Sequence, residues 1–187
     1  MNKNPQVAVL LADGFEDIEA VTVIDVLRRA AVPVSVTGVG CAADKLVCSS
    51  HGLCIKVDCL LEDLPTKDLK MLVFPGGLPG ATNLAASEEV CQLARIVLER
   101  GGWAAAICAA PIALSAAGLL DGVEYTCYPS FEKKIPEGVY TGARVQTCGK
   151  IITACGPGAS LEFAFALLEA LGKEKDVATL RKGMLVE

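Results

Sequence analysis

A single cysteine ends an apolar segment of strand length, and small residues surround it. Residues 102–108 read Gly-Trp-Ala-Ala-Ala-Ile-Cys, and two alanines and a proline follow. A strand that stops, turns sharply and starts a helix forms a nucleophile elbow, which needs small residues two positions before and after the reactive side chain. Ala106 and Ala110 occupy those positions. The pattern predicts a nucleophilic Cys108, with an inert core cysteine as the alternative, because buried cysteines often act as small hydrophobic residues.

Alternating strand and helix patterns predict an α/β domain around a mostly parallel, doubly wound sheet. Continuous apolar runs indicate strands that are buried on both faces. Strands are predicted at 6–11, 32–37, 70–74, 102–107 and 124–127, helices at 16–30, 87–100, 111–118 and 159–171, a hairpin at 144–154, and short helical turns at 60–64 and 130–135. Residues 46–58 fit a hairpin or edge strands, and residues 173–185 fit a final helix or a tail.

Length and composition fit one globular domain, which we expect to span residues 1–187. The chain is 52% hydrophobic and 21% charged, with a net charge of -5 and no basic run, which argues against nucleic-acid binding. Its longest uncharged run, residues 101–120, divides into strand, turn and helix at Pro111, so we expect no membrane span. The first residues lead directly into a strand without an apolar signal region, which favours a cytoplasmic protein.

The nine cysteines do not form a recognisable metal or disulfide pattern. Their number is odd, no pair has the C-x-x-C spacing, and His51 is the only histidine. A structural zinc site needs four such ligands in a cluster, which the sequence does not offer. We therefore expect mostly free thiols in a reducing compartment and no bound metal.

Four turns are predicted at the carboxyl ends of strands, where open parallel sheets bind their ligands. They cover residues 13–19, 75–80, 108–111 and 156–160. Because these ends meet at the same edge of a sheet, the four turns could converge on one site.

Glu19 lies one turn into the first predicted helix and could serve two purposes. With Glu16 and Asp17 it could simply complement the positive end of the helix dipole. Alternatively, Glu19 points at Cys108, where an ionised carboxylate would raise the pKa of the thiol. A working pair therefore needs a protonated Glu19 that donates a hydrogen bond to the thiolate, while a helix N-terminus behind Cys108 lowers the thiol pKa.

Gly76 and Gly77 would let the backbone approach a ligand closely. The N–H of Gly77 could form an oxyanion hole with the N–H of Ala109, with an ordinary glycine turn as the alternative.

Two further features could bind part of a substrate. Gly156 and Pro157 precede a helix whose N-terminus could bind an anion, but Leu161 replaces the last glycine of a dinucleotide fingerprint, so no nicotinamide cofactor is expected. His51 is the only imidazole and could act as a base or be a solvated loop residue.

Four motifs together resemble the ThiJ/PfpI superfamily, and most of all the branch that contains the parkinsonism-associated protein deglycase and bacterial ThiJ-like proteins. They hold their order over residues 7–171, nearly the whole chain. The motifs are Ala-Asp-Gly-Phe-Glu-Asp-Ile-Glu-Ala at 12–20, Phe-Pro-Gly-Gly at 74–77, Ala-Ala-Ile-Cys-Ala-Ala-Pro at 105–111 and Gly-Pro-Gly-Ala-Ser-Leu-Glu-Phe at 156–163.

The resemblance implies a flavodoxin-like, three-layer α/β sandwich and a homodimer. It also implies that Cys108 is the nucleophile and redox-sensitive thiol, that protonated Glu19 is its hydrogen-bond partner and proton shuttle, and that the amides of Gly77 and Ala109 are oxyanion donors. Activities of such proteins include cofactor-free conversion of methylglyoxal or glyoxal to the hydroxy acid, removal of early glycation adducts, and redox-dependent chaperone or sensor roles.

The sequence departs from the family pattern at several positions. Ala109 stands where the peptidase branch has a histidine, which argues against proteolysis. Tyr128 takes the place of a histidine near the nucleophile, and a phenol is a poor base near neutral pH. His51 and Cys155 stand where relatives often have arginine, which should weaken anion binding beside Cys108.

The sequence therefore predicts a cysteine-dependent, cofactor-free enzyme of the glyoxalase or deglycase type that acts on a small dicarbonyl or glycated substrate. The alternative is a redox sensor or chaperone in which Cys108 oxidises to a sulfinate.

Overall fold

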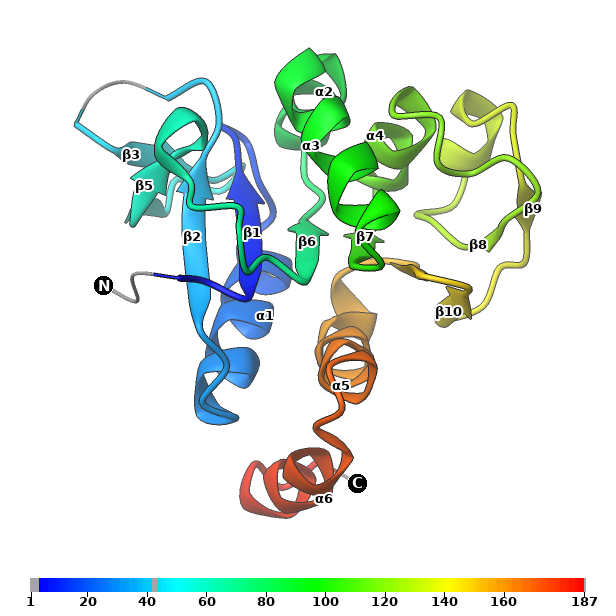
Figure 1. Cartoon of the computed structure of the whole chain (residues 1–187). Coiled ribbons are helices and arrows are strands. Elements are labelled where there is room, and N and C mark those ends of the chain that lie inside the picture. Colours follow the sequence, from blue (N-terminus) through cyan, green and yellow to red (C-terminus); the bar gives the residue numbers. More distant parts are fainter. Residues whose placement is uncertain (1–3, 42–43, 187) are drawn as a thin grey trace.

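The computed structural model describes residues 4–41 and 44–186 and builds this part of the chain around a seven-stranded sheet. All neighbouring strands in the sheet are parallel except the β10–β11 pair at one edge (Figure 1). The order across the sheet is β10 (Val145–Cys148), β11 (Ile151–Ala154), β7 (Trp103–Ile107), β6 (Met71–Phe74), β1 (Val7–Leu11), β2 (Val34–Gly38) and β5 (Cys59–Leu60).

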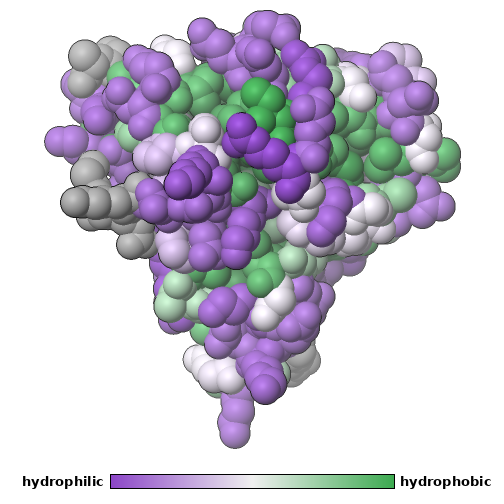
Figure 2. Space-filling view, viewed as in Figure 1, coloured by the Kyte–Doolittle hydropathy of each residue, from purple (hydrophilic) through white to green (hydrophobic). Residues whose placement is uncertain are grey.

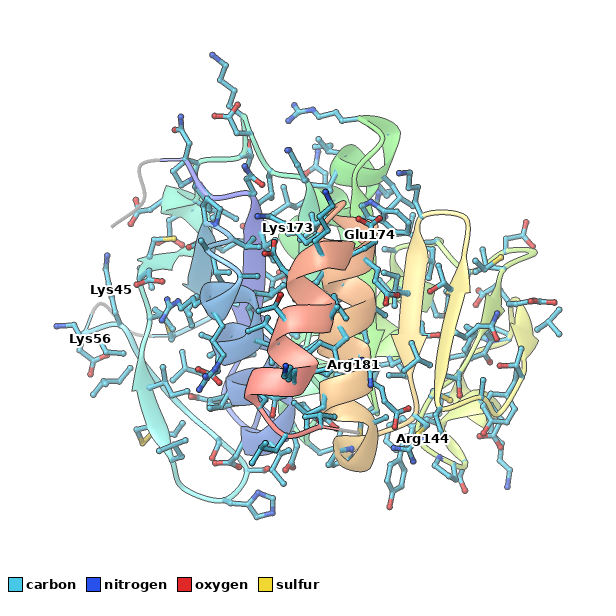
Figure 3. The ribbon with its side chains drawn as sticks, turned by 90° about the horizontal axis from the view of Figure 1, so that it is seen from below. Lys45, Lys56, Arg144, Lys173, Glu174 and Arg181 are labelled. Atoms are coloured by element: carbon cyan, nitrogen blue, oxygen red, sulfur yellow. A yellow bond between two sulfur atoms is a disulfide. The ribbon has the colours of Figure 1, made fainter. Side chains whose placement is uncertain are left out.

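Helices cover both faces of this sheet and form the outer layers. On one face α1 (Asp17–Arg29) packs against α5 (Ser160–Ala170), and α6 (Glu174–Gly183) packs on α5. A second group of helices, which pack against one another, consists of α2 (Gly80–Ala86), α3 (Glu88–Glu99) and α4 (Pro111–Ala116). Seen from below, α6 lies along α5, with Lys173 and Glu174 at its start and Arg181 further along (Figure 3).

Apolar strands and alanines explain this packing. Every residue of β1, β2 and β6 is buried, as the continuous apolar runs of β1 and β6 predict for central strands. In β7 the residues at 104–106 are alanines with no exposed surface, so helices can pack closely on both faces of that strand. The largest fully buried side chains include Phe15, Phe74 and Phe163, which fill the space between the layers.

Two small sheets lie outside the central one. The hairpin of β3 (Leu46–Cys48) and β4 (Cys54–Lys56) is antiparallel, whereas β8 (Glu124–Tyr125) and β9 (Val139–Tyr140) pair in parallel. Short 3-10 helices occur at Leu61–Asp63, Phe131–Lys134 and Pro157–Ala159. Residues 46–58, which fit two alternatives in the sequence, therefore form a hairpin.

The predicted α/β class, the mostly parallel sheet and the order of its elements are confirmed. Residues 173–185, left open between a helix and a tail, contain helix α6. Several elements were not predicted. They include α2, because Pro79 and Gly80 at its start resemble a turn, and β5 and β9, because two residues carry no periodic signal. The expected extent of the domain, residues 1–187, stays a prediction, and its residues 1–3, 42–43 and 187 lie outside the described part.

The lengths of the helices and the hydropathy of the surface both bear on the expected absence of a membrane span. Among the described residues, no helix is both long and apolar enough to cross a bilayer. The face seen in Figure 2 is covered mainly by hydrophilic residues, with smaller hydrophobic patches between them.

Candidate active site

Cys108 lies at a sharp corner between β7 and α4. Its φ is +63°, a left-handed conformation that is uncommon for a residue with a side chain. Two backbone hydrogen bonds fix the corner: the Cys108 N–H donates to the Ala154 carbonyl at 2.9 Å, and the Tyr128 N–H donates to the Cys108 carbonyl at 2.8 Å. Pro111 begins the helix, and 9% of Cys108 remains exposed. This is the backbone geometry that a nucleophile elbow requires.

Glu19 is completely buried beside this corner. Its Oε2 accepts a hydrogen bond from the Gly76 N–H at 2.7 Å. Its other oxygen, Oε1, is buried and has no nitrogen or oxygen partner among the described residues. The carboxyl group instead interacts with the Cys108 thiol. Because Oε2 already accepts from the Gly76 N–H, a proton on Glu19 belongs on Oε1.

Burial and mutual charge set the protonation of this pair. Burial raises the pKa of Glu19 to about 7, against a partial opposing effect of the Gly76 hydrogen bond. Burial also raises the pKa of the Cys108 thiol, and the charge and hydrogen bond of Glu19 raise it further. The two groups titrate as a pair, so the thiolate is favoured only while Glu19 holds a proton.

Two backbone amides oppose this rise in the pKa of the Cys108 thiol. Hydrogen bonds from the N–H groups of Ala109 and Gly77 lower the pKa of Cys108. The structure thus brings together the two donors that the sequence suggested for an oxyanion hole. Both amides favour negative charge at this point, whether it resides on sulfur or on a bound oxygen.

The glycines at 76 and 77 are needed for close approach. A Cβ atom at Gly76 would lie 2.7 Å from both the Cys108 Cβ and the Glu19 Oε2. Gly77 has a φ of +87°, and a Cβ atom there would collide with the backbone of Gly14 and Glu16. Only glycines let this loop fit between the elbow and the start of α1.

Replacing Gly76 with alanine is expected to lower the free energy of unfolding by about 1–3 kcal/mol, because either Cys108 or Glu19 must move away. The urea midpoint should fall while the m-value stays constant. Gly158→Ala is the matched control, because a Cβ atom at Gly158 meets nothing within 4 Å. Equal midpoints for the two variants would contradict the proposed contact.

His51 lies on the β3–β4 hairpin, where its imidazole contacts Ser50 and two acidic residues at the start of α1. Its Nδ1 is 2.9 Å from Asp17 Oδ2 and 3.7 Å from Glu16 Oε2. The hydrogen bond with Asp17 and then the charge of Glu16 raise the pKa of His51. Burial opposes ionisation of Asp17, but hydrogen bonds from Ser49 and His51 outweigh the effect of burial, so the pKa of Asp17 is lowered. These contacts hold the imidazole at the start of α1.

Tyr128 and the turn after β11 flank the elbow. The Tyr128 side chain is exposed, and a Cβ atom at Gly156 would lie 3.3 Å from its ring. Cys155 directly follows Ala154, whose carbonyl accepts the Cys108 N–H, and Pro157 starts a short 3-10 helix. The segments anchored to the elbow thus carry four predicted site residues: Tyr128, Cys155, Gly156 and Pro157.

Sequence reasoning missed two contributors to the site. The Ala154 carbonyl holds the elbow through β11, a contact that follows only from the parallel β7–β11 register. Glu16 donates its N–H to the Gly76 carbonyl at 2.9 Å, and its charge raises the pKa of Glu19. The spacing of three residues between Glu16 and Glu19 was the available signal, but for Glu16 it indicated only a charge that complements the helix dipole.

The fold agrees with a family comparison. The DJ-1/PfpI family model matches residues 5–170, and the chain belongs to this family. The crystal structure of Drosophila melanogaster DJ-1beta is similar, with a TM-score of 0.93, 34% identity and coverage of 98% of this chain and 99% of that chain. The predicted flavodoxin-type fold is confirmed.

Curated relatives place the chain near the DJ-1 homologues. It is 37% identical to the Parkinson disease protein 7 homolog of Danio rerio, covering 96% of each chain. It is 32% identical to the Caenorhabditis elegans glutathione-independent glyoxalase DJR-1.2, covering 92% of each. The chain spans less than half of two Arabidopsis thaliana relatives, at 41% of DJ-1 homolog B and 44% of homolog A.

Proposed function

We propose that this chain is a cysteine-dependent, cofactor-free enzyme of the glyoxalase or deglycase type, acting on methylglyoxal, glyoxal or early glycation adducts. One observation carries the proposal: a fully buried carboxyl group, with a pKa of about 7, contacts a cysteine held at a left-handed corner. A family relative named as a glutathione-independent glyoxalase supports the same chemistry.

The first step is addition of sulfur to the substrate. The Cys108 thiolate attacks the aldehyde carbon of methylglyoxal, a C–S bond forms, and the carbonyl π-electrons move to oxygen. The amides of Gly77 and Ala109 are placed to donate to negative charge here. Protonated Glu19 gives its proton to the new oxygen, which yields a neutral hemithioacetal and a carboxylate.

The second step is a proton transfer within the hemithioacetal. The Glu19 carboxylate takes the proton from the former aldehyde carbon and returns a proton to the neighbouring carbon, while the hydroxyl proton on the former aldehyde oxygen passes to the ketone oxygen. These transfers leave a thioester of lactate on Cys108. Water then hydrolyses the thioester to lactate and restores the thiol. Methylglyoxal plus water becomes lactate, so no external oxidant or reductant is required.

The proton path gives a direct test in deuterated water. We expect the purified protein to convert methylglyoxal to lactate without glutathione, and the product to carry deuterium at C2, because the Glu19 proton exchanges with solvent. Proton NMR of the product measures both. Lactate formed at the wild-type rate by Glu19→Gln would contradict the role of Glu19, and no lactate above the protein-free control would contradict the enzyme itself.

A redox role is the second candidate, and the two amides facing sulfur favour it. Oxidation of Cys108 to a sulfinate places negative oxygens where the Gly77 and Ala109 amides and a protonated Glu19 can donate to them. Mild peroxide should therefore add two oxygens to Cys108, as measured by intact mass and peptide mapping. Oxidation that falls first on Cys127 or another thiol would exclude this role.

Other properties stay predictions that belong with the proposal. The substrate class is a small dicarbonyl or a glycated adduct, and Tyr128 and His51 are proposed to border its site. A peptidase is disfavoured because Ala109 replaces the histidine that such chemistry would use. Family membership implies a homodimer, which light scattering would measure, and the cytoplasmic location remains an expectation from the sequence.

A further inference from the structure

The β3–β4 hairpin carries a disulfide that sequence reasoning did not predict. Cys48 and Cys54 lie directly opposite each other in the two strands and are bonded, whereas the other seven cysteines are free. Cys54 is exposed and Cys48 is half-buried. Exposed disulfides are open to attack by a thiolate, which makes them the reducible and regulatory kind.

The disulfide is tied directly to the loop that leads from β1 to α1. The Gly14 N–H donates to the Cys48 carbonyl at 2.7 Å, and the Cys48 N–H donates to Asp13 Oδ1 at 2.9 Å. Cys48 itself is therefore one of the anchors of this loop.

The tip of the hairpin adds contacts to the next residues of the same loop. The Ser50 N–H donates to the Phe15 carbonyl at 2.9 Å. The Ser49 hydroxyl donates to Asp17 Oδ1 at 2.6 Å, and His51 Nδ1 is 2.9 Å from Asp17 Oδ2. The hairpin thus contacts Asp13, Gly14, Phe15 and Asp17 of the turn that starts α1.

The turn at residues 13–17 also supports the elbow. Glu16 donates its N–H to Gly76, whose own N–H donates to the Glu19 carboxyl. Gly77, whose amide donates to Cys108, packs against the backbone of Gly14 and Glu16. A continuous path of hydrogen bonds and close contacts therefore connects Cys48 to the groups around Cys108.

The strand pairing within the hairpin is short. Each strand has three residues, and an isolated two-stranded hairpin is marginally stable in water. Cleaving the covalent link between its strands should let the hairpin fray and loosen residues 13–17. Water would then reach Glu19 more easily and favour its ionised form, which disfavours the thiolate of Cys108.

We propose that Cys48 and Cys54 form a second redox site, a dithiol–disulfide pair that reacts with dithiol reductants and controls the reactivity of Cys108 through the turn at residues 13–17. A reducing dithiol gives two electrons and two protons to the disulfide, becomes a disulfide itself, and leaves two thiols on the hairpin. The inference rests on the proposed role of Cys108 as the reactive thiol.

The test compares oxidised protein with protein reduced by dithiothreitol and then desalted without oxygen. Iodoacetamide labelling, resolved by peptide mass spectrometry, should show Cys48 and Cys54 labelled only after reduction. Reduction should also slow labelling of Cys108 at pH 7 by about threefold, the effect of half a unit in an effective pKa. Hydrogen exchange at residues 13–17 should become faster.

Variants separate this coupling from general effects of reduction. The double variant Cys48→Ser, Cys54→Ser should label at Cys108 like reduced wild type and should not respond to dithiothreitol. Cys148→Ser, on edge strand β10, should behave as wild type in both states. The proposal is overturned if the pair is already labelled before reduction, or if reduction changes neither Cys108 labelling nor exchange at residues 13–17. Dithiol-dependent labelling in a protein that does not convert methylglyoxal would overturn the proposed enzyme alone.

Discussion

Cys108→Ser is expected to lower kcat for methylglyoxal at least about a thousandfold, because a serine hydroxyl is far harder to ionise than a thiol. The two candidate bases among the described residues cannot take its proton. Glu19 must give up a proton rather than take one at the start of the reaction, and His51 is bound to Asp17. Serine is close to cysteine in size, so the urea midpoint should change little. Initial rates of methylglyoxal loss measure the effect.

Cys127→Ser is the matched control for this variant. Cys127 is fully buried near the elbow, and burial followed by the charge of Glu132 raises its pKa to about 12, so it stays a thiol at neutral pH. We expect this variant to retain activity. If Cys127→Ser lost turnover while Cys108→Ser retained it, the assignment of the nucleophile would be wrong.

The elbow was predictable because its signal is local. A strand-length apolar run, a cysteine, small residues and Pro111 follow one another in the chain, and the structure turns at that cysteine. Glu19 was predictable only as one of two alternatives. Its position at the start of a helix was clear, but whether a carboxyl group faces solvent or a thiol depends on which loop packs above it, here Gly76.

The remaining features depend on contacts between distant segments. The Cys48–Cys54 disulfide follows from the register of β3 and β4, and a spacing of six residues does not specify that register. The sequence led us to expect mostly free thiols, and seven of nine are free. In the same way, His51 contacts Asp17 only when the β3–β4 hairpin folds back onto α1. No periodic pattern in the sequence encodes that arrangement.

Glu19→Gln is expected to lower kcat by about two to four orders of magnitude, because glutamine cannot move a proton between the two carbons of the hemithioacetal. The amide keeps an oxygen that can accept from the Gly76 N–H and a nitrogen that can donate to the Cys108 thiolate. Labelling of Cys108 by iodoacetamide should therefore persist while turnover is lost. Exposed Glu89→Gln serves as the control and should match wild type in both measurements.

The same variant tests the raised pKa of Glu19 through stability. The folded protein binds this proton more tightly than the unfolded chain, with a pKa of about 7 against an ordinary value of 4.5. The resulting stability is complete below about pH 4.5 and is lost as the pH rises through about 7. Glutamine has no such proton, so the stability of Glu19→Gln relative to wild type should rise by about 2 kcal/mol between pH 5 and pH 8. Urea unfolding at both pH values measures this difference. A constant difference would mean that Glu19 is ionised in the resting enzyme at both pH values, and the thiolate of Cys108 would then lack its proton donor.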